Sequence, residues 1–496
     1  MVSAWEPSWQ RKMFPSPSLN PPQRWEVPGI TTPTLELPVM SGLLSTSSHS
    51  SRTQTGPGNH HSSSSGSSPN ILLFIRFVAP AKEIKEYLVR FAREYDLYRH
   101  IQFETRVQSA VWREEEAVWK VVTNKGALKC RILISACGAL HKPALPSIAG
   151  IQNFKGKSFH SAEWDHGVAL DGKRVGIVGS AASAVQIVPT IANKVKELFV
   201  FQRTPNWFYP KLDPVYSDTV KNLFRRIPAL MTLQRVTLFL LVEIWAAVWL
   251  TKGRLSQWVQ MVIEGNMMTQ LDDKQSLTKQ LIPKYNLGCK RVLLSDEFLP
   301  VFKNNKSCHL VTDPIDCVTT HGVKTDKEEI DLDIVVYATG FDIEGSICSF
   351  DTTGRNNTLL RNHFETDPCA YLGITVPNFP NFFYVLGPNT VLAHSSLVYM
   401  IECQVGYIMQ TIQKMAEFHI RTIEPRKDKT RDFQNKMGEW TKNKNFSASC
   451  RSWYKNKDGI NFVLWPSNLL QYWWMTAKPN LLEDFKIVFD SEYYNM

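Results

Sequence analysis

The sequence lacks the signatures of structural metal sites, secretion and nucleic-acid binding. Its nine cysteines are scattered, odd in number and without a C-x-x-C pair, which disfavours both a zinc site and a disulfide framework. No basic run or stacking aromatic motif points to nucleic acid. The N-terminus has neither the basic start nor the apolar core of a signal peptide. These absences predict a reducing, cytoplasmic compartment, with no metal and no nucleic-acid partner.

The sequence also lacks an apolar run that reads as a membrane span. The nearest candidate, Val236 to Leu250, covers 15 residues, contains Glu243 and falls short of the roughly 20 residues that cross a bilayer. We expect a buried or interfacial helix there, which leaves a peripheral membrane contact open. The formal net charge of +10 is compatible with such a contact, or with a polyanionic cofactor.

With 496 residues, the chain is long enough for two or three domains. Residues 1–72 are rich in serine and proline and are predicted to be disordered. A helix is predicted from Pro80, with Ile84, Leu88 and Phe91 among the residues of its apolar face. Three strand-like runs then end at Ala136.

The most informative stretch runs from Arg174 to Thr204. Arg174 to Gly179 is an apolar, β-branched run that predicts a buried parallel strand, and apolar residues at helical spacing follow from Val185. A turn of small residues between them lets the backbone approach a pyrophosphate, and the helix start offers free N–H groups and a positive dipole end. We therefore expect cofactor contacts from the turn residues Gly179, Ser180, Ala181, Ser183 and Ala184.

The end of the next strand indicates which nicotinamide cofactor is bound. An NAD site usually has an acidic residue there for the ribose 2′-hydroxyl, whereas this chain has Arg203 and Thr204. An arginine suits a 2′-phosphate, so NADP is favoured over NAD; the alternative for Arg203 is a solvated strand end. Ala181 replaces the glycine usual at the closest phosphate approach, and its methyl group is tolerable if φ stays negative.

A second pattern precedes this turn. Phe154, Gly156, His160, Trp164 and Asp165 fit F-x-G-x-x-x-H-x-x-x-W-[P/D], which resembles the fingerprint of the Baeyer–Villiger branch of the flavin-dependent monooxygenases. The resemblance implies an α/β fold with two Rossmann-like dinucleotide-binding domains, an FAD-type domain and an NADP-type domain inserted into it. It also implies a catalytic role for His160; the alternative is a buried histidine satisfied by the backbone.

The block LIPKYNLGCKRVLLSDEFLPVF also resembles that family. By this match Lys290 pairs with the NADP 2′-phosphate and Arg291 is the catalytic arginine. A permanently charged, forked donor stabilises developing oxyanion charge without reorganising. The alternative for the adjacent Lys-Arg is a surface basic pair.

Two later segments complete the resemblance. Ala338 to Asp342 resembles the A-T-G-F-D strand by which the chain re-enters the FAD domain, and it places Thr339 and Gly340 at the cofactor. The loop Gly387-Pro388-Asn389-Thr390, followed by His394, resembles the loop beside the flavin ring, which implies contacts from Asn389 and Thr390. An ordinary Gly-Pro turn that caps a helix is the alternative.

The family's first element, a strand–GxGxxG–helix unit for the ADP half of FAD, has no counterpart before residue 75, so the FAD-type domain is expected to be N-terminally incomplete. The expected division is 1–72 disordered, 73–165 with 331–475 FAD-type, 166–330 NADP-binding with a helical insertion at about 212–275, and 476–496 a tail. Either the polypeptide is incomplete or flavin chemistry has been lost.

Two functions follow. One is an NADPH- and FAD-dependent monooxygenase that transfers one oxygen atom from O2 into a small ketone, or onto the soft nitrogen or sulfur of an amine or sulfide. The other is an NADP-binding remnant that acts as a binding or regulatory module. Flavin content discriminates them, since the cofactor carries the reaction.

Overall fold

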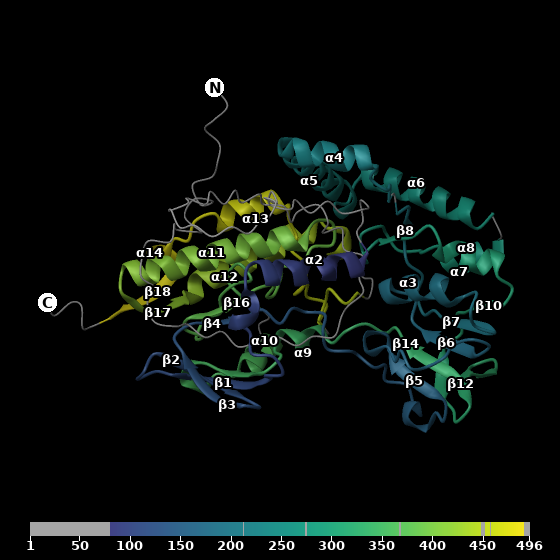
Figure 1. Ribbon diagram of the computed structural model, residues 1–496, viewed down its shortest axis with the longest axis horizontal. Coiled ribbons are helices and arrows are strands. Elements are labelled where there is room, and N and C mark those ends of the chain that lie inside the picture. Colours follow the sequence, from purple (N-terminus) through teal and green to yellow (C-terminus); the bar gives the residue numbers. More distant parts are fainter. Residues whose placement is uncertain are drawn as a thin grey trace, which may run out of the picture.

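The computed structural model describes residues 80–490, except 212, 273–274, 367–368, 448–451 and 457. The expected disorder of residues 1–72 lies outside the described residues, as does the end of the tail from 491. Figure 1 shows two β-sheet regions side by side along the long axis, with helices α4 to α6 along one edge.

The first region is a five-stranded parallel sheet in the order β10-β7-β6-β14-β5. Its strands are β5 (Lys157–His160), β6 (Arg174–Val178), β7 (Glu197–Phe201), β10 (Cys308–Val311) and β14 (Ile334–Tyr337). The central strands are almost wholly apolar and buried, as expected for a parallel sheet with both faces covered. Helices α3 (Ala182–Ile191) and α8 (Phe298–Asn304) pack on one another beside it. The predicted strand–turn–helix unit is therefore confirmed.

The sheet draws its strands from three separate parts of the chain. Tyr337 of β14 lies opposite His160 of β5 on one side and Val178 of β6 on the other. Three strand ends thus form one row, and the turns that follow them meet at the same edge of the sheet. The strands β5 and β14 lie in residue ranges that the expected division gives to the FAD-type domain, so that division stays a proposal.

The second region contains a four-stranded sheet, a short parallel pair and an antiparallel pair. The sheet has the order β15-β1-β2-β3, the parallel pair is β16-β4, and the antiparallel pair is β17-β18. The strands are β1 (Val107–Arg113), β2 (Val118–Thr123), β3 (Gly126–Cys130), β4 (Leu133–Ser135), β15 (Asp351–Thr353), β16 (Phe382–Tyr384), β17 (Ile420–Pro425) and β18 (Phe485–Phe489). The strand β18 shows that the expected C-terminal tail is folded as far as Phe489.

Helices cover this region. They are α2 (Ala81–Glu94), α9 (Ile343–Ile347), α10 (Leu360–Thr366), α11 (Leu397–Glu417), α12 (Lys427–Lys442), α13 (Leu469–Thr476) and α14 (Leu481–Asp484). Ser396 and Asn468 cap α11 and α13, since their side-chain oxygens accept from the N–H groups of Tyr399 and Gln471. The helix predicted from Pro80 is present as α2, but none of its residues is buried.

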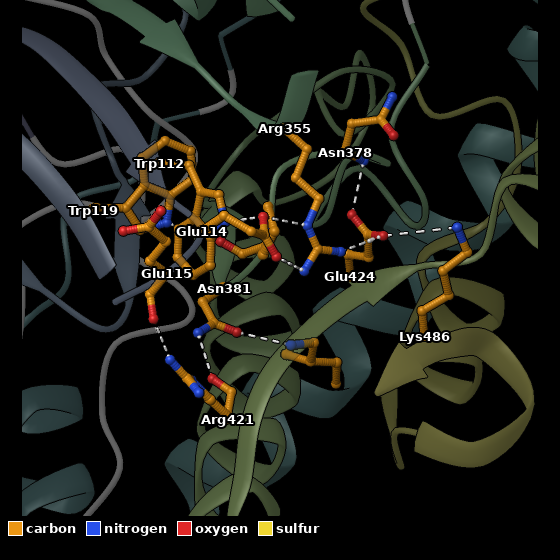
Figure 2. A network of polar contacts seen from close by, with 12 residues as sticks. Trp112, Glu114, Glu115, Trp119, Arg355, Asn378, Asn381, Arg421, Glu424 and Lys486 are labelled. Atoms are coloured by element: carbon orange, nitrogen blue, oxygen red, sulfur yellow. Dashed lines mark hydrogen bonds and ion pairs between the residues drawn. The ribbon is translucent and has the colours of Figure 1, made fainter. Parts of the chain in front are cut away.

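A charged network centred on Arg355 joins the turn after β1 to β17 and β18 (Figure 2). The guanidinium donates two hydrogen bonds of 2.8 Å to the Glu114 carboxylate and a third, also 2.8 Å, to Glu424 Oε1. Glu424 is buried and also accepts from the Asn378 N–H, and Lys486 approaches it within 3.8 Å. The hydrogen bond from Arg355 lowers the pKa of Glu114. A forked cation between two carboxylates thus ties segments that are more than two hundred residues apart.

The remaining elements are small strands and the helical insertion. The strands are β8 (Phe208–Tyr209), β9 (Leu293–Leu294), β11 (Ile315–Val318), β12 (Gly322–Thr325) and β13 (Glu329–Asp331), and the helices are α4 (Asp218–Arg226), α5 (Pro228–Leu250), α6 (Arg254–Gln270) and α7 (Gln275–Leu281). The expectation of a 15-residue apolar run was wrong in length. The helix α5 has 23 residues because Pro228 starts it before Val236, and Ala229–Ala246 is long and apolar enough to cross a membrane. Since only 6% of that window is buried, α5 is no core helix.

Candidate functional site

The turn after β6 has the geometry of a phosphate cradle. Gly179 has a φ of +112°, a conformation that side chains rarely adopt, and its N–H donates to Phe201 O at 2.9 Å. A Cβ at this position would lie 2.4 Å from the carbonyl oxygen of Ala338. Only glycine fits between β6 and the end of β14, and the chain therefore turns tightly into α3.

The start of α3 leaves N–H groups free for an anion. No side chain caps this helix, and the residue at its N-cap, Ala181, is exposed with a φ of −86°. Its methyl group therefore needs no strained backbone, as the sequence reasoning required. The Ser180 carbonyl accepts from Asn206 Nδ2 at 2.9 Å, which fixes the turn to the segment after β7. Ser183 is half-buried, whereas Ala184 faces the core and can contribute only its backbone.

Basic side chains gather at the end of β7. Arg203 is exposed, and burial together with the charge of Arg203 lowers the pKa of Lys290. The Lys290 ammonium lies 5.1 Å from the ring centre of Tyr285, whose hydroxyl donates to Pro205 O at 2.9 Å. Two neighbouring cations repel one another unless an anion lies between them. The arrangement fits the 2′-phosphate of NADP, the group expected at this strand end.

A groove of about 360 Å³ opens beside these cations. It is lined by Thr204, Pro205, Lys279, Gln280, Ile282, Lys284 and Tyr285. Lys279 and Lys284 are exposed and add two positive charges to its rim. The residues present therefore fit NADP at both of its phosphate groups: the glycine turn for the pyrophosphate and the basic groove for the 2′-phosphate.

His160 lies at the end of β5, against the returning strand. It is buried, its Nδ1 accepts from the Ala162 N–H at 3.1 Å, and its Nε2 is buried without a hydrogen bond of regular geometry. Burial lowers the pKa of His160, while the Gly340 backbone and the Glu163 carboxylate act in the opposite direction. These contacts support the alternative that the sequence left open, a buried histidine that positions backbone.

Thr339 and Gly340 belong to a two-stranded connection between the regions. Thr339 Oγ1 donates to Ala144 O at 2.6 Å, and the Ala144 N–H donates to Gly340 O at 3.0 Å. The Asp342 N–H donates to Lys142 O at 2.9 Å in the same ribbon. Gly340 has a φ of +87° with open space around its missing side chain, so its backbone can meet a ligand.

Arg291 and the loop 387–390 are linked through Tyr454. Arg291 is exposed and lies close enough to Tyr454 for its charge to oppose the rise in pKa that burial gives that phenol. The hydroxyl of Tyr454 is buried without a hydrogen-bond partner. The carbonyl of Tyr454 accepts from Phe462 N, and the Phe462 carbonyl accepts from the Asn389 N–H at 2.8 Å. A short backbone path therefore connects the predicted catalytic arginine with the predicted flavin loop.

The side chains of Asn389 and Thr390 in that loop already have hydrogen-bond partners in the protein. Asn389 Nδ2 donates to Asn461 O at 3.0 Å, and Thr390 Oγ1 donates to Gly387 O at 2.6 Å. Asn389 and Thr390 can therefore contact a flavin through their backbone groups. Burial lowers the pKa of the neighbouring His394 to about 4, and neither of its ring nitrogens has a hydrogen-bond partner.

The described residues therefore fit FAD in part. The buried His394 imidazole, which makes no hydrogen bond with any described residue, and the open glycine turn at residue 340 suit a polar ring system. The ADP half of FAD needs a second strand–glycine turn–helix unit, and none lies in the part of the chain that the structure describes. In that part, the strand β4 pairs with β16 alone.

Sequence reasoning missed Tyr454, Tyr285 and Asn206. Each of them acts through a contact with a residue far away in the chain, as in the bond from Asn206 to Ser180. It also missed that Cys289, next to Lys290, is disulfide-bonded, whereas seven other described cysteines carry free thiols.

Gly179→Ala should lower stability and abolish nucleotide binding together. We expect a cost of about 2–3 kcal/mol, because the new methyl group combines positive-φ strain with overlap of the Ala338 carbonyl. Gly172→Ala is the matched control: Gly172 also has a positive φ, +69°, but open space around it, so about 1 kcal/mol is expected. Thermal unfolding and NADPH titration of the two variants measure stability and nucleotide binding. Equal losses of stability in Gly179→Ala and Gly172→Ala would show that the overlap with the Ala338 carbonyl is relieved.

The comparisons with known proteins agree with this site. The profile of the FMO-like family, described as flavin-binding monooxygenase-like, matches residues 73–347. The FAD-binding monooxygenase ktnD of Aspergillus niger is 33% identical over 408 residues, which cover 79% of this chain and 67% of that protein. A Baeyer-Villiger monooxygenase of Streptomyces coelicolor is 32% identical, with 81% of this chain and 78% of that protein covered.

Solved structures show the same fold. The crystal structure of OTEMO in complex with FAD and NADP has a TM-score of 0.76 and 26% identity, and the match covers 84% of this chain and 86% of that one. Oxidized steroid monooxygenase bound to NADP has a TM-score of 0.75 and 26% identity, with 84% and 87% covered. Both fold and sequence thus agree, and this chain belongs to the Baeyer–Villiger branch of the flavin-binding monooxygenase-like family, whose cofactors are FAD and NADP.

Proposed function

We propose that this protein is an NADPH- and FAD-dependent monooxygenase that inserts one oxygen atom of O2 into a ketone, or transfers it to a soft nitrogen or sulfur. For a ketone the balance is ketone, O2, NADPH and a proton giving an ester, NADP⁺ and water. The observation that carries the proposal is the grouping of Arg203, Lys290 and Arg291 with the Gly179 turn.

Each residue has a defined task in this proposal. The Gly179 turn and the start of α3 hold the NADPH pyrophosphate, and Arg203 with Lys290 holds the 2′-phosphate. Arg291 supplies a fixed positive charge where negative charge develops during oxygen transfer. His160 is assigned a positioning role, because it is buried, accepts from the Ala162 N–H and packs edge-on against the Phe341 ring. The flavin, when bound, accepts a hydride and activates O2.

The second candidate is an NADP-binding remnant without flavin chemistry. It is favoured by one observation, that the described residues contain a single glycine turn at a helix start and leave β4 with one neighbouring strand. In this case the site would bind NADPH normally but would not catalyse oxygen transfer. We also propose the domain limits given above and a cytoplasmic location with peripheral membrane contact.

The experiment that separates the candidates is an absorbance spectrum of the purified full chain, before and after addition of FAD, followed by NADPH oxidation in air. Flavin bands with product from cyclohexanone or thioanisole would support the monooxygenase. A colourless protein that binds NADPH and stays colourless with added FAD would support the remnant. Absence of NADPH binding would contradict both.

A further inference from the structure

The helix α5 is amphipathic, but its apolar side chains face the solvent and its charged side chains face the protein. Its exposed positions recur at helical spacing and carry mainly large apolar side chains: Leu233, Val236, Leu240, Leu241, Ile244 and Trp245. Its charged and amide side chains, Glu243, Arg235 and Gln234, are only partly exposed and contact the protein, so that two threonines are the polar residues among its exposed positions. Soluble proteins place these two kinds of residue the other way round. The solvent-facing side of α5 is therefore built for an apolar environment.

Polar contacts hold α5 against the fold along its length. Gln234 Nε2 donates to Tyr216 Oη at 2.7 Å, Arg235 pairs with Glu402 at 3.2 Å, and Glu243 Oε2 accepts from the Leu469 N–H at 2.7 Å. Glu243 also lies 3.8 Å from His394 in the loop described above. To cross a bilayer, α5 would have to break these contacts and leave their charges in hydrocarbon. It is placed to lie on a membrane and not to span it.

The helix α6 packs beside α5 (Figure 1). It buries Val259, Ile263 and Met267 in the core. Its outer side carries four apolar residues, Leu255, Trp258, Met261 and Val262. These four and the six of α5 are each between 44% and 62% exposed. We call these ten residues the α5–α6 surface; apolar patches of this kind mark interaction sites.

The exposed charges at the two ends of α5 are positive. From Asp218 to Glu264 six residues are basic and three are acidic: Glu243 faces inward, Asp218 pairs with Lys221, and Glu264 is partly exposed on α6. Arg225 and Arg226 are exposed just before α5, and Lys252 and Arg254 are exposed just after it. Both ends of the apolar stripe thus carry cations, and Trp245 and Trp258 lie within it.

We propose that the α5–α6 surface docks onto an anionic lipid bilayer, with α5 in the plane of the interface. Apolar side chains enter the acyl boundary, tryptophans lie at headgroup depth, and the flanking arginines and lysines bind acidic headgroups. A two-fold dimer through this surface would bring the basic ends of two copies together, which is unfavourable.

The test is co-sedimentation of the full chain with vesicles of phosphatidylcholine, with and without phosphatidylserine. Wild type should pellet with the anionic vesicles. Leu240→Glu with Ile244→Glu should lower the vesicle partition coefficient at least about tenfold, because two charges enter the apolar stripe. Arg225→Glu with Arg226→Glu should lower it by about fivefold or more for each arginine, since each basic residue contributes about 1 kcal/mol near such a surface.

Leu88→Glu with Phe91→Glu is the matched control. These α2 residues are also exposed and apolar but lie outside the α5–α6 surface, so binding should not change. All replaced residues are exposed, and circular dichroism with thermal unfolding checks that the variants fold. No pelleting of wild type, equal pelleting of all variants, or a dimer in size-exclusion chromatography that Leu240→Glu with Ile244→Glu dissolves would overturn the proposal.

Discussion

Replacing Arg291 by alanine should abolish product formation while leaving NADPH binding and flavin reduction in place. Arg291 is exposed, lies beside Tyr454 and belongs to the pair of basic residues next to the nucleotide groove. Removing one donor that stabilises developing negative charge typically lowers turnover about 10²- to 10³-fold. A fixed cation is also the hardest group to replace by water, so a loss at the upper end is expected here.

Two measurements check this. Product from cyclohexanone is quantified by gas chromatography, and flavin reduction by NADPH is followed anaerobically by stopped flow. Arg291→Lys is the matched control: it keeps the charge but loses the fork, and it should recover part of the product yield. Unchanged product yield in Arg291→Ala would remove Arg291 from its assigned role. Loss of flavin reduction as well would show that Arg291 acts in NADPH binding instead.

Replacing Arg203 by alanine should weaken NADPH binding by about 10- to 100-fold and NADH binding hardly at all. The guanidinium is expected to bond the 2′-phosphate, a charge-assisted contact worth about 1.5–3 kcal/mol, and NADH lacks that group. Lys290→Ala should show the same selectivity, because Lys290 lies within the electrostatic reach of Arg203. Calorimetric titration of the protein with each nucleotide measures both constants and needs no turnover.

Lys194→Ala provides the control for net charge. Lys194 is exposed beyond the C-terminal end of α3, away from the free N–H groups at the start of that helix. Its removal changes the charge by the same amount and should leave both affinities alone. Equal losses of NADPH and NADH binding in Arg203→Ala would contradict the 2′-phosphate assignment and leave Arg203 as a solvated strand end.

Local patterns predicted much of the nucleotide site, because its elements are set by neighbours in sequence. A β-branched run, a small-residue turn and helical spacing predicted β6, the Gly179 turn and α3 in the right order. The condition on Ala181, a negative φ, is met in the structure. Residue roles such as those of Lys290 and Arg291 came from resemblance, and the geometry groups them without testing the roles.

Features that depend on distant contacts could not be predicted. Tyr454 reaches Arg291 only after the C-terminal segment has packed, and Arg355 bridges Glu114 and Glu424 across three separate parts of the chain. The inward direction of Glu243 depends on the position of Leu469. Hydropathy alone showed that α5 is apolar, but not which side of it faces the protein.

The paired segments around Ala144 and Gly340 limit how the two sheet regions can move. The backbone crosses between them twice at this point, and the crossings are bonded to one another at Lys142–Asp342, Ala144–Gly340 and Ala144–Thr339. A pair of hydrogen-bonded strands bends more easily than it twists about its long axis, because twisting would strain the hydrogen bonds between the strands. Opening and closing of the space between the regions should therefore follow a single angular coordinate, with Gly340 near its pivot.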